Sequence, residues 1–222
     1  MLKTSQTNLV HETGLDQKKD FLQELTEKRF LQLDNLLTAE TCQLLSKRIH
    51  ILQSAGKLKE CDLCPLSQWI YGDDCFAEVH KFFCEQLSSL FGIELVATFN
   101  AVRFYSQKAT LPKHIDREAC EFSLSVPIDY SGDELWPIYL SEEKQEAQGI
   151  PISLKKGDGI MLQGAKVYHW RKPLKNQWQI QAFFFFVDAA GEFKDQAGDI
   201  IERYPQQKSN GLEIKSGSFS IS

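Results

Sequence analysis

The sequence predicts an α+β protein in which helices come first and a β-sandwich or barrel follows. The chain of 222 residues has 42% apolar and 25% charged residues, which is enough apolar material for one domain with a sizeable core. Helical periodicity continues as far as Gly92, whereas from Glu94 to Asp188 short apolar runs are separated by Gly, Pro, Asp and Asn. Helices that precede strands, rather than alternate with them, favour the α+β class.

Changes in composition also divide the chain. We expect a flexible N-terminal arm over residues 1–14, a single domain over 15–204 and a polar C-terminal tail over 205–222. Within the domain, the helical part covers residues 15–92 and the barrel core covers 93–188. The helices should pack on one outer face of the sheet.

Apolar residues recur at helical spacing in three segments, and the last of them carries a continuous apolar stripe. These segments are Leu15 to about Lys28, Thr38 to about Leu52, and Asp73 or Asp74 to Gly92. Between them, Phe30–Asp34 is expected to be a short extended piece and residues 57–72 are expected to be irregular.

Seven short apolar runs in the second part are predicted to be strands. They are Leu95–Tyr105, Glu121–Ile128, Leu135–Leu140, Ile152–Leu154, Gly159–Gln163, Lys166–Arg171 and Trp178–Val187. Alternation places Arg103 and Tyr105 on one face of the first strand. It also gives the second strand a small polar face with Ser123 and Ser125, which suits the wall of a cavity.

A His-x-Asp pair, His114 and Asp116, is the strongest chemical signal in the chain. Residues two apart on an extended strand point the same way, so both side chains can reach one ion. His169 is the leading candidate for a third ligand. Two histidines and one carboxylate form the facial triad of non-haem Fe(II) oxygenases, which leaves open coordination positions.

Basic side chains near these ligands could bind an anion. Arg171 shares a face with His169 and could hold a carboxylate of a dicarboxylic acid through a bidentate fork. Arg117 and Arg103 are further candidates. Gln179 and Gln181 share a face of the last strand and could donate or accept hydrogen bonds.

Charge and hydropathy exclude several classes of function. The net charge of −5 makes a nucleic-acid partner unlikely, and no apolar run approaches the roughly 20 residues that span a bilayer. The N-terminus has no apolar signal segment, so we expect a cytoplasmic protein whose six cysteines are free thiols. Cys61 and Cys64 form a single Cys-x-x-Cys, and a zinc site would need a second such pair.

Taken in order, Tyr105, His114-x-Asp116, Gly132-Asp133-Glu134, Lys156-Gly157-Asp158 and His169 resemble the 2-oxoglutarate/Fe(II)-dependent dioxygenases over about residues 93–188. The segments His114–Ser123, Trp136–Tyr139 and His169-Trp170-Arg171 resemble one branch of that superfamily, with His-x-Asp-Arg and His-Trp-Arg motifs, and so do residues 60–72.

The resemblance implies a double-stranded β-helix (jelly-roll) core with iron at His114, Asp116 and His169. It implies 2-oxoglutarate and O2 as co-substrates and a hydroxylation that releases succinate and CO2. Many members place Arg or Lys about ten residues after the distal His, where this chain has Gln179.

For the far carboxylate of 2-oxoglutarate we therefore favour Arg171, then Arg117 or Arg103, with Tyr105 as a hydrogen-bonding helper. Ser123 and Gln181 are further candidate co-substrate contacts. We expect the primary substrate, which the sequence does not reveal, to enter near residues 57–72 and 106–112.

Two other functions remain open. One is a catalytically silent jelly roll that binds a small molecule or a protein. The other is a cupin-type metalloenzyme that does not use 2-oxoglutarate, although cupins use more histidine ligands, often as His-x-His.

Overall fold

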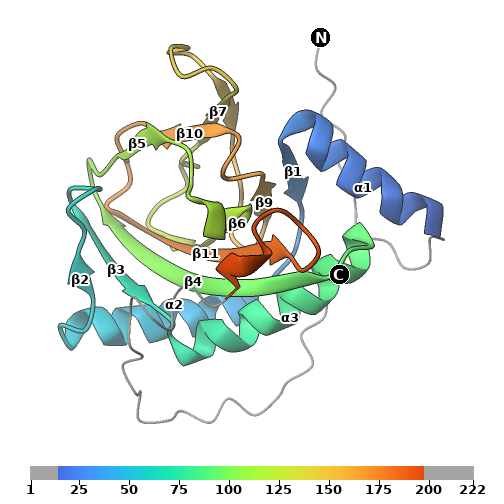
Figure 1. The fold of residues 1–222 in the computed structure, drawn as a ribbon. Coiled ribbons are helices and arrows are strands. Elements are labelled where there is room, and N and C mark those ends of the chain that lie inside the picture. The colour runs from blue at the N-terminus through green and yellow to red at the C-terminus, as the bar shows by residue number, and fades with distance from the viewer. Residues whose placement is uncertain (1–14, 198–222) are drawn as a thin grey trace.

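Two antiparallel β-sheets face each other in the computed structural model, which describes residues 15–197 (Figure 1). The large sheet has the order β1 (Phe30–Leu33), β9 (Gly159–Leu162), β6 (Phe122–Tyr130), β11 (Trp178–Asp188), β4 (Leu95–Ser106), β3 (Ser67–Tyr71), β2 (Lys59–Glu60). The small sheet has the order β5 (Leu111–His114), β10 (Tyr168–Arg171), β7 (Ile138–Ser141), β8 (Ile150–Ile152). This is the jelly-roll core expected for the chain, and the α+β class is confirmed. The expected arm over 1–14 and tail over 205–222 lie outside the described residues.

Strand β11 lies at the centre of the large sheet and separates two environments. It pairs with β4 on one side and with β6 on the other. Because successive side chains alternate between faces, Phe184 and Phe186 point to the helices and join the main core, while Phe183 and Phe185 point between the sheets. The outer face of the sheet is therefore the packing face, and the inner face is free to form a cavity.

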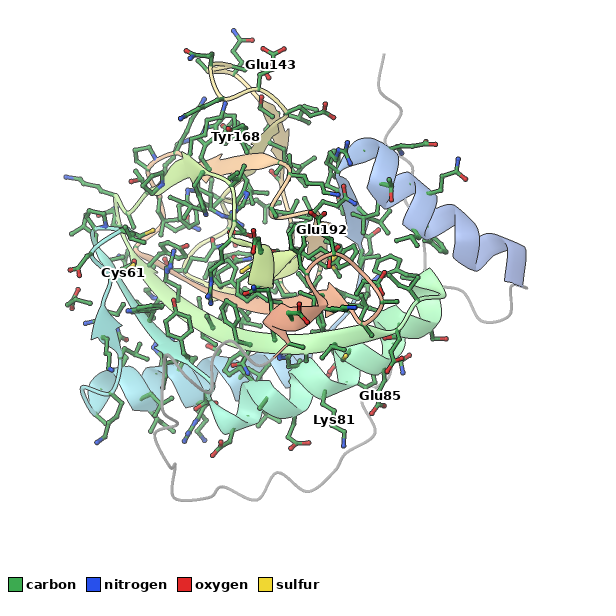
Figure 2. All side chains as sticks on the ribbon, in the orientation of Figure 1. Cys61, Lys81, Glu85, Glu143, Tyr168 and Glu192 are labelled. Atoms are coloured by element: carbon green, nitrogen blue, oxygen red, sulfur yellow. The ribbon has the colours of Figure 1, made fainter. Side chains whose placement is uncertain are left out.

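Helices α2 (Ala39–Ser54) and α3 (Asp74–Phe91) cover the outer face of the large sheet, and α1 (Leu15–Lys28) packs on α3 and β1 (Figure 1). The apolar stripe of α3 packs on the sheet, with Phe83 only 5.1 Å from Phe184 between ring centroids. Its opposite face carries Lys81 and Glu85, which point to solvent (Figure 2).

The helix ends follow the expected capping signals. Thr38 Oγ1 accepts a hydrogen bond from Thr41 N at 3.2 Å, and Asp73 Oδ1 accepts one from Cys75 N at 3.1 Å. Gly92 ends α3 with φ of 68°, a conformation that glycine adopts without strain.

All seven predicted strands are present, with ends shifted by a few residues, but the prediction that residues 57–72 are irregular is wrong in part. Lys59–Glu60 and Ser67–Tyr71 form β2 and β3, while residues 61–66 between them are irregular as expected, and β3 pairs with β4 from Ser67↔Tyr105 to Tyr71↔Ala101. The part from residue 15 to 92 therefore contributes β1, β2 and β3 as well as helices. Such short strands are stabilised by a partner that lies far away in the sequence, so local patterns do not reveal them.

Candidate metal centre and cavity

His114 and His169 face each other across the pair of strands β5 and β10. They are directly opposed partners in the antiparallel register, and their ring centroids are 4.2 Å apart. Opposed residues in such a pair have neighbouring side chains on the same face. Strand pairing therefore brings together two imidazoles that are far apart in the sequence.

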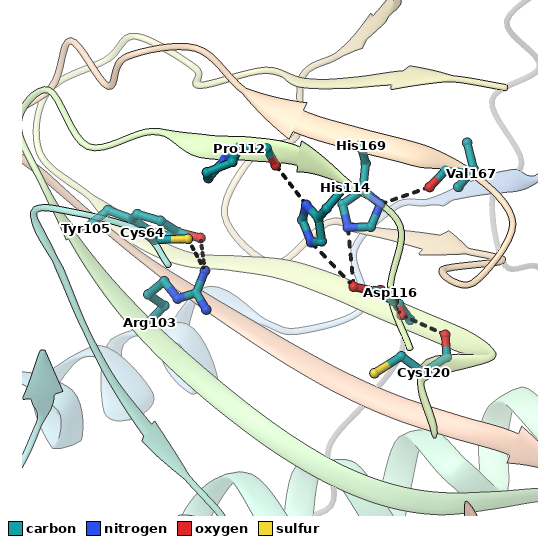
Figure 3. A network of polar contacts seen from close by, with 10 residues as sticks. Cys64, Arg103, Tyr105, Pro112, His114, Asp116, Cys120, Val167 and His169 are labelled. Atoms are coloured by element: carbon teal, nitrogen blue, oxygen red, sulfur yellow. Dashed lines mark hydrogen bonds and ion pairs between the residues drawn. The ribbon is translucent and has the colours of Figure 1, made fainter. Parts of the chain in front are cut away.

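Asp116 completes the cluster from just beyond the end of β5. Its Oδ1 atom lies 3.5 Å from His114 Nε2 and 3.6 Å from His169 Nε2 (Figure 3). The strand itself ends at His114, so strand geometry alone does not orient the carboxylate. Instead, Asp116 N donates to Gly164 O at 2.9 Å, and Ser123 Oγ donates to Asp116 Oδ2 at 2.7 Å.

The second nitrogen of each imidazole is held by the backbone. His114 Nδ1 lies 2.8 Å from Pro112 O, and His169 Nδ1 lies 3.1 Å from Val167 O. A carbonyl oxygen only accepts hydrogen bonds, so each Nδ1 carries a proton, and in the neutral ring the lone pair is on Nε2, which faces Asp116. Three electron-rich atoms thus converge within 4.8 Å of one another, and a cation between them would relieve their repulsion.

The protonation of the cluster suits a metal ligand set. Burial raises the pKa of Asp116, but His169, His114 and Ser123 outweigh it and hold that pKa below its usual value. Burial lowers the pKa of His169, and this exceeds the opposing effect of Asp116. Burial also acts to lower the pKa of His114, but its interactions with Asp116 raise it overall. Asp116 is therefore ionised and His169 is neutral near pH 7.

Gly164 leaves room for this cluster. A Cβ atom there would lie 2.4 Å from Asp116 Oδ2, 2.4 Å from Ser123 Oγ and 2.7 Å from Cys120 O. In the sequence, Gly164 lies between the predicted strands Gly159–Gln163 and Lys166–Arg171. Its close approach to Asp116 depends on the packing of distant segments, and no local signal reveals it.

A cavity of about 280 Å³ lies between the sheets beside the cluster. Its polar lining comprises His114, Asp116, His169, Arg103, Arg117, Arg171, Ser123 and Ser125. Its apolar lining includes Tyr71, Phe99, Phe183, Phe185, Leu111, Leu162 and, at the exposed rim, Leu63 and Ile115. Leu63 and Leu111 belong to the two segments where we expect substrate entry.

Arg171 is buried in the small-sheet wall of the cavity, with 4% of its surface exposed. Its Nη1 donates to Trp136 O, and its guanidinium lies 4.8 Å from the centroid of the Trp136 ring. Burial lowers the pKa of Arg171 to about 10, with Tyr105 acting in the opposite direction. Among residues 15–197, no carboxylate forms an ion pair with this guanidinium.

Arg103 lies in the facing wall, on β4. Its Nη1 donates to Cys64 Sγ at 3.1 Å and to Tyr105 OH at 3.2 Å (Figure 3), and its Nε is buried without a partner among the described residues. Burial raises the pKa of Cys64 to about 11 and also raises the pKa of Tyr105, so both neighbours are neutral near pH 7. The charge of Arg103 is therefore uncompensated by them.

The remaining predicted residues divide into two groups. Ser123 and Arg117 line the cavity, and the Arg117 guanidinium lies 4.7 Å from the centroid of the Phe99 ring. Gln181 is fully buried behind the lining, where its Nε2 donates to Ser125 Oγ at 2.9 Å and its Oε1 accepts from Gln179 Nε2 at 2.8 Å. Gln181 thus holds Ser125, which does line the cavity.

All six cysteines are free thiols, as expected. Within residues 15–197, the only group of three or more His, Cys, Asp or Glu side chains spaced to hold a metal ion is the His114–Asp116–His169 cluster. None of the helices in that part of the chain combines the length and apolar character needed to cross a bilayer.

Comparison with solved structures gives the same fold. A prolyl-4-hydroxylase from Pseudomonas putida aligns with a TM-score of 0.61 and 12% identity over 77% of this chain and 98% of the other. The epimerase SnoN, in complex with Fe3+, alpha ketoglutarate and nogalamycin RO, aligns with a TM-score of 0.62 and 11% identity over 87% and 93%. A Trichoplax adhaerens prolyl hydroxylase, bound to a hypoxia inducible factor peptide fragment, aligns with a TM-score of 0.60 and 11% identity over 82% and 94%.

At these identities the likeness shows a shared jelly-roll fold. No protein-family model matches the sequence, and no curated protein matches it.

Proposed function

We propose that this chain is an Fe(II)- and 2-oxoglutarate-dependent oxygenase that hydroxylates a substrate with release of succinate and CO2. The observation that carries the proposal is the convergence of His114 Nε2, His169 Nε2 and Asp116 Oδ1 beside a cavity. Two imidazoles and one carboxylate are the donor set that non-haem Fe(II) oxygenases use. Iron bound there would activate O2 together with the keto acid of 2-oxoglutarate.

The surrounding residues support an ordered ligand set. Pro112 O and Val167 O fix the tautomers of the two imidazoles, and Ser123 orients the carboxylate. Aromatic side chains, among them Phe99 and Phe185, line the cavity beside these residues.

Arg171 is the proposed anchor for the far carboxylate of 2-oxoglutarate. It lies two residues from the ligand His169, is buried in the cavity wall and has no carboxylate partner among the described residues. A buried guanidinium without a counterion is costly, and a bound carboxylate would offset that cost through a bidentate fork. Gln179, at the position where many superfamily members have a cation, is neutral.

Binding can be tested before any substrate is known. Anaerobic addition of Fe(II) and then 2-oxoglutarate to the full chain should produce the visible charge-transfer band of the Fe(II) chelate, and Asp116→Ala should abolish it. Arg171→Leu should shift the 2-oxoglutarate titration to higher concentration by about tenfold or more, because a buried charge partner is lost. Arg117→Leu removes the same charge from an exposed side chain and serves as the matched control.

Turnover then separates this proposal from the alternatives. Iron-loaded protein should convert 2-oxoglutarate to succinate slowly in air even without a substrate, as measured by mass spectrometry. Iron binding without a 2-oxoglutarate complex would favour the cupin-type enzyme, and the absence of both would leave the silent binding module.

A further inference from the structure

Arg103 and Arg171, one half-buried and one buried, both line the cavity. Of the two carboxylates of 2-oxoglutarate, one would chelate the iron, so only the other could pair with an arginine. Given the proposed function, the chelating carboxylate balances the charge that remains on Fe(II) after Asp116 binds. The far carboxylate balances Arg171. Arg103 is then left without a counterion among residues 15–197 while its Nε is buried, which is an unfavourable state for a guanidinium.

The two cations occupy different parts of the cavity. Arg171 projects from β10 of the small sheet and is almost fully buried against Trp136. Arg103 projects from β4 of the large sheet and lies under the turn between β2 and β3, where it contacts Cys64. Leu63 in that turn is 81% exposed and lines the same cavity. Arg103 therefore belongs to the side from which a molecule enters.

The local contacts of Arg103 fix its direction without neutralising it. Cys64 and Tyr105 both accept from Nη1, which holds the guanidinium in place. Its Nε is buried without a partner, and no carboxylate among residues 15–197 forms an ion pair with the guanidinium. A pre-oriented cation on the cavity wall with no counterion in that part of the chain is a candidate anion subsite.

The wall next to this subsite is aromatic. The guanidinium carbon of Arg103 lies 5.8 Å from the centroid of the Phe183 ring, and Phe183 and Phe185 stack with centroids 6.3 Å apart. Phe99 packs on Phe185 at 4.3 Å. Among residues 15–197, Asp116 is the only carboxylate in the cavity lining, and its Oδ1 faces the two histidines, so that part of the chain offers no partner to a cationic group.

From this distribution of charge we infer that the primary substrate is a carboxylate monoanion with an apolar, ring-sized body, whose carboxylate binds Arg103 while the body lies on Phe183 and Phe185. The inference rests on the proposed function, which assigns Arg171 to the co-substrate. Arg103 is a substrate-binding residue in this assignment.

The test uses the full chain loaded with redox-inert Zn(II) and saturated with 2-oxoglutarate. Isothermal titration calorimetry measures the binding of three probes, benzoate, 3-phenylpropionate and hexanoate, and of the corresponding uncharged amides. At least one carboxylate should bind about tenfold more tightly, or better, than the corresponding amide. Arg103→Gln should remove that difference in affinity. If no carboxylate binds more tightly than its amide, the inference is overturned.

Two further variants make the assignment specific. Arg103→Lys keeps the charge and should restore part of the preference for the carboxylate, which excludes a merely misfolded Arg103→Gln protein. Lys59→Gln removes a charge from exposed β2, outside the cavity lining, and should leave the preference intact. An equal loss in Lys59→Gln would mean a diffuse positive field instead of a subsite at Arg103.

The affinity for 2-oxoglutarate separates the two proposals. Arg103→Gln should change the Kd for 2-oxoglutarate by less than about twofold, whereas Arg171→Gln should raise it about tenfold or more. An equal rise in both variants would show that both arginines hold the co-substrate. The assignment of Arg103 to the substrate would then fail, while the proposed function would stand. If wild-type protein does not bind 2-oxoglutarate at all, the proposed function fails, and the probe comparison on zinc-loaded protein still decides whether Arg103 selects carboxylates.

Discussion

Individual atoms decide whether the cluster can hold a metal. The triad residues were identified from the sequence, but the features that orient them were not. Pro112 O and Val167 O fix the imidazoles, and the missing Cβ of Gly164 leaves space for Asp116. Backbone carbonyls and absent atoms have no signature in a residue pattern, because every residue has a carbonyl and many glycines serve only turns.

Gly164→Ala should abolish tight metal binding while the fold remains. The added methyl group would lie 2.4 Å from Asp116 Oδ2 and from Ser123 Oγ, so the carboxylate must turn away from the histidines. We expect the affinity for Zn(II) to fall by about 100-fold, at or beyond the upper end of the effects of mutating residues that support a ligand. Calorimetric titration measures the affinity, and Ala165→Gly is a neighbouring control. Wild-type affinity in Gly164→Ala would refute the proposed role of this glycine.

His80 should make the protein sensitive to acid. It is buried on α3, its Nε2 lies 3.0 Å from Phe185 O, and burial lowers its pKa to about 4. Since the unfolded chain titrates near 6.5, its contribution to stability is complete above that pH and is lost as the pH falls toward 4, by about 3 kcal/mol. His80→Gln should flatten urea-unfolding free energies over this range when each protein is normalised to pH 8. An equally steep loss in the variant would exclude His80 as the cause.

At the scale of elements, Asp73 joins a helix cap to an ion pair. Its Oδ1 caps α3, and its Oδ2 accepts from Arg48 Nε at 3.1 Å and from Arg48 Nη2 at 2.9 Å. This contact ties α2 to the start of α3. The sequence predicts a helix that begins at Asp73 or Asp74, but it gives no sign of the ion pair, because Arg48 lies on another helix.

Asp73→Ala should therefore destabilise the protein more than the loss of a cap alone. We expect a fall in the free energy of unfolding of about 3 kcal/mol, because the variant loses the cap and leaves a largely buried Arg48 unpaired. Thr38→Ala removes only the cap of α2 and should cost about 1 kcal/mol. Equal losses in the two variants, measured by urea unfolding, would mean that the Arg48 contact adds nothing.

Strands β2 and β3 show what element prediction misses. The seven strands recognised in the sequence have long or alternating apolar runs, whereas β2 is exposed and β3 is only partly buried apart from Ser67. The pairing of β3 with β4, and of β2 with β3, places Cys64 on Arg103 and Leu63 at the cavity rim. The same segment that looked irregular thus forms one edge of the cavity.

At the scale of the whole molecule, metal binding and folding should be linked. The three proposed ligands come from β5, the segment after β5 and β10, so they are adjacent only in the folded chain. Zn(II) at 100 times its Kd should stabilise the protein by about 2.7 kcal/mol, which raises the Tm by roughly 5–10 °C for a chain of this length. Scanning calorimetry should show no such rise for Asp116→Ala and a full rise for the exposed control Asp133→Ala. A rise that persists in Asp116→Ala would place the metal elsewhere.

The sequence by itself determined the α+β class, most strands and helices, and the residues with metal-ligand chemistry, because periodicity and residue type are local properties. Only the tertiary structure decided that His169 lies opposite His114, that Arg171 and Arg103 line the same cavity from facing sheets, and that Gln181 lies behind Ser125. Those relations depend on strand register and on the closure of two sheets, which bring together residues distant in the sequence and are set by packing across the whole core.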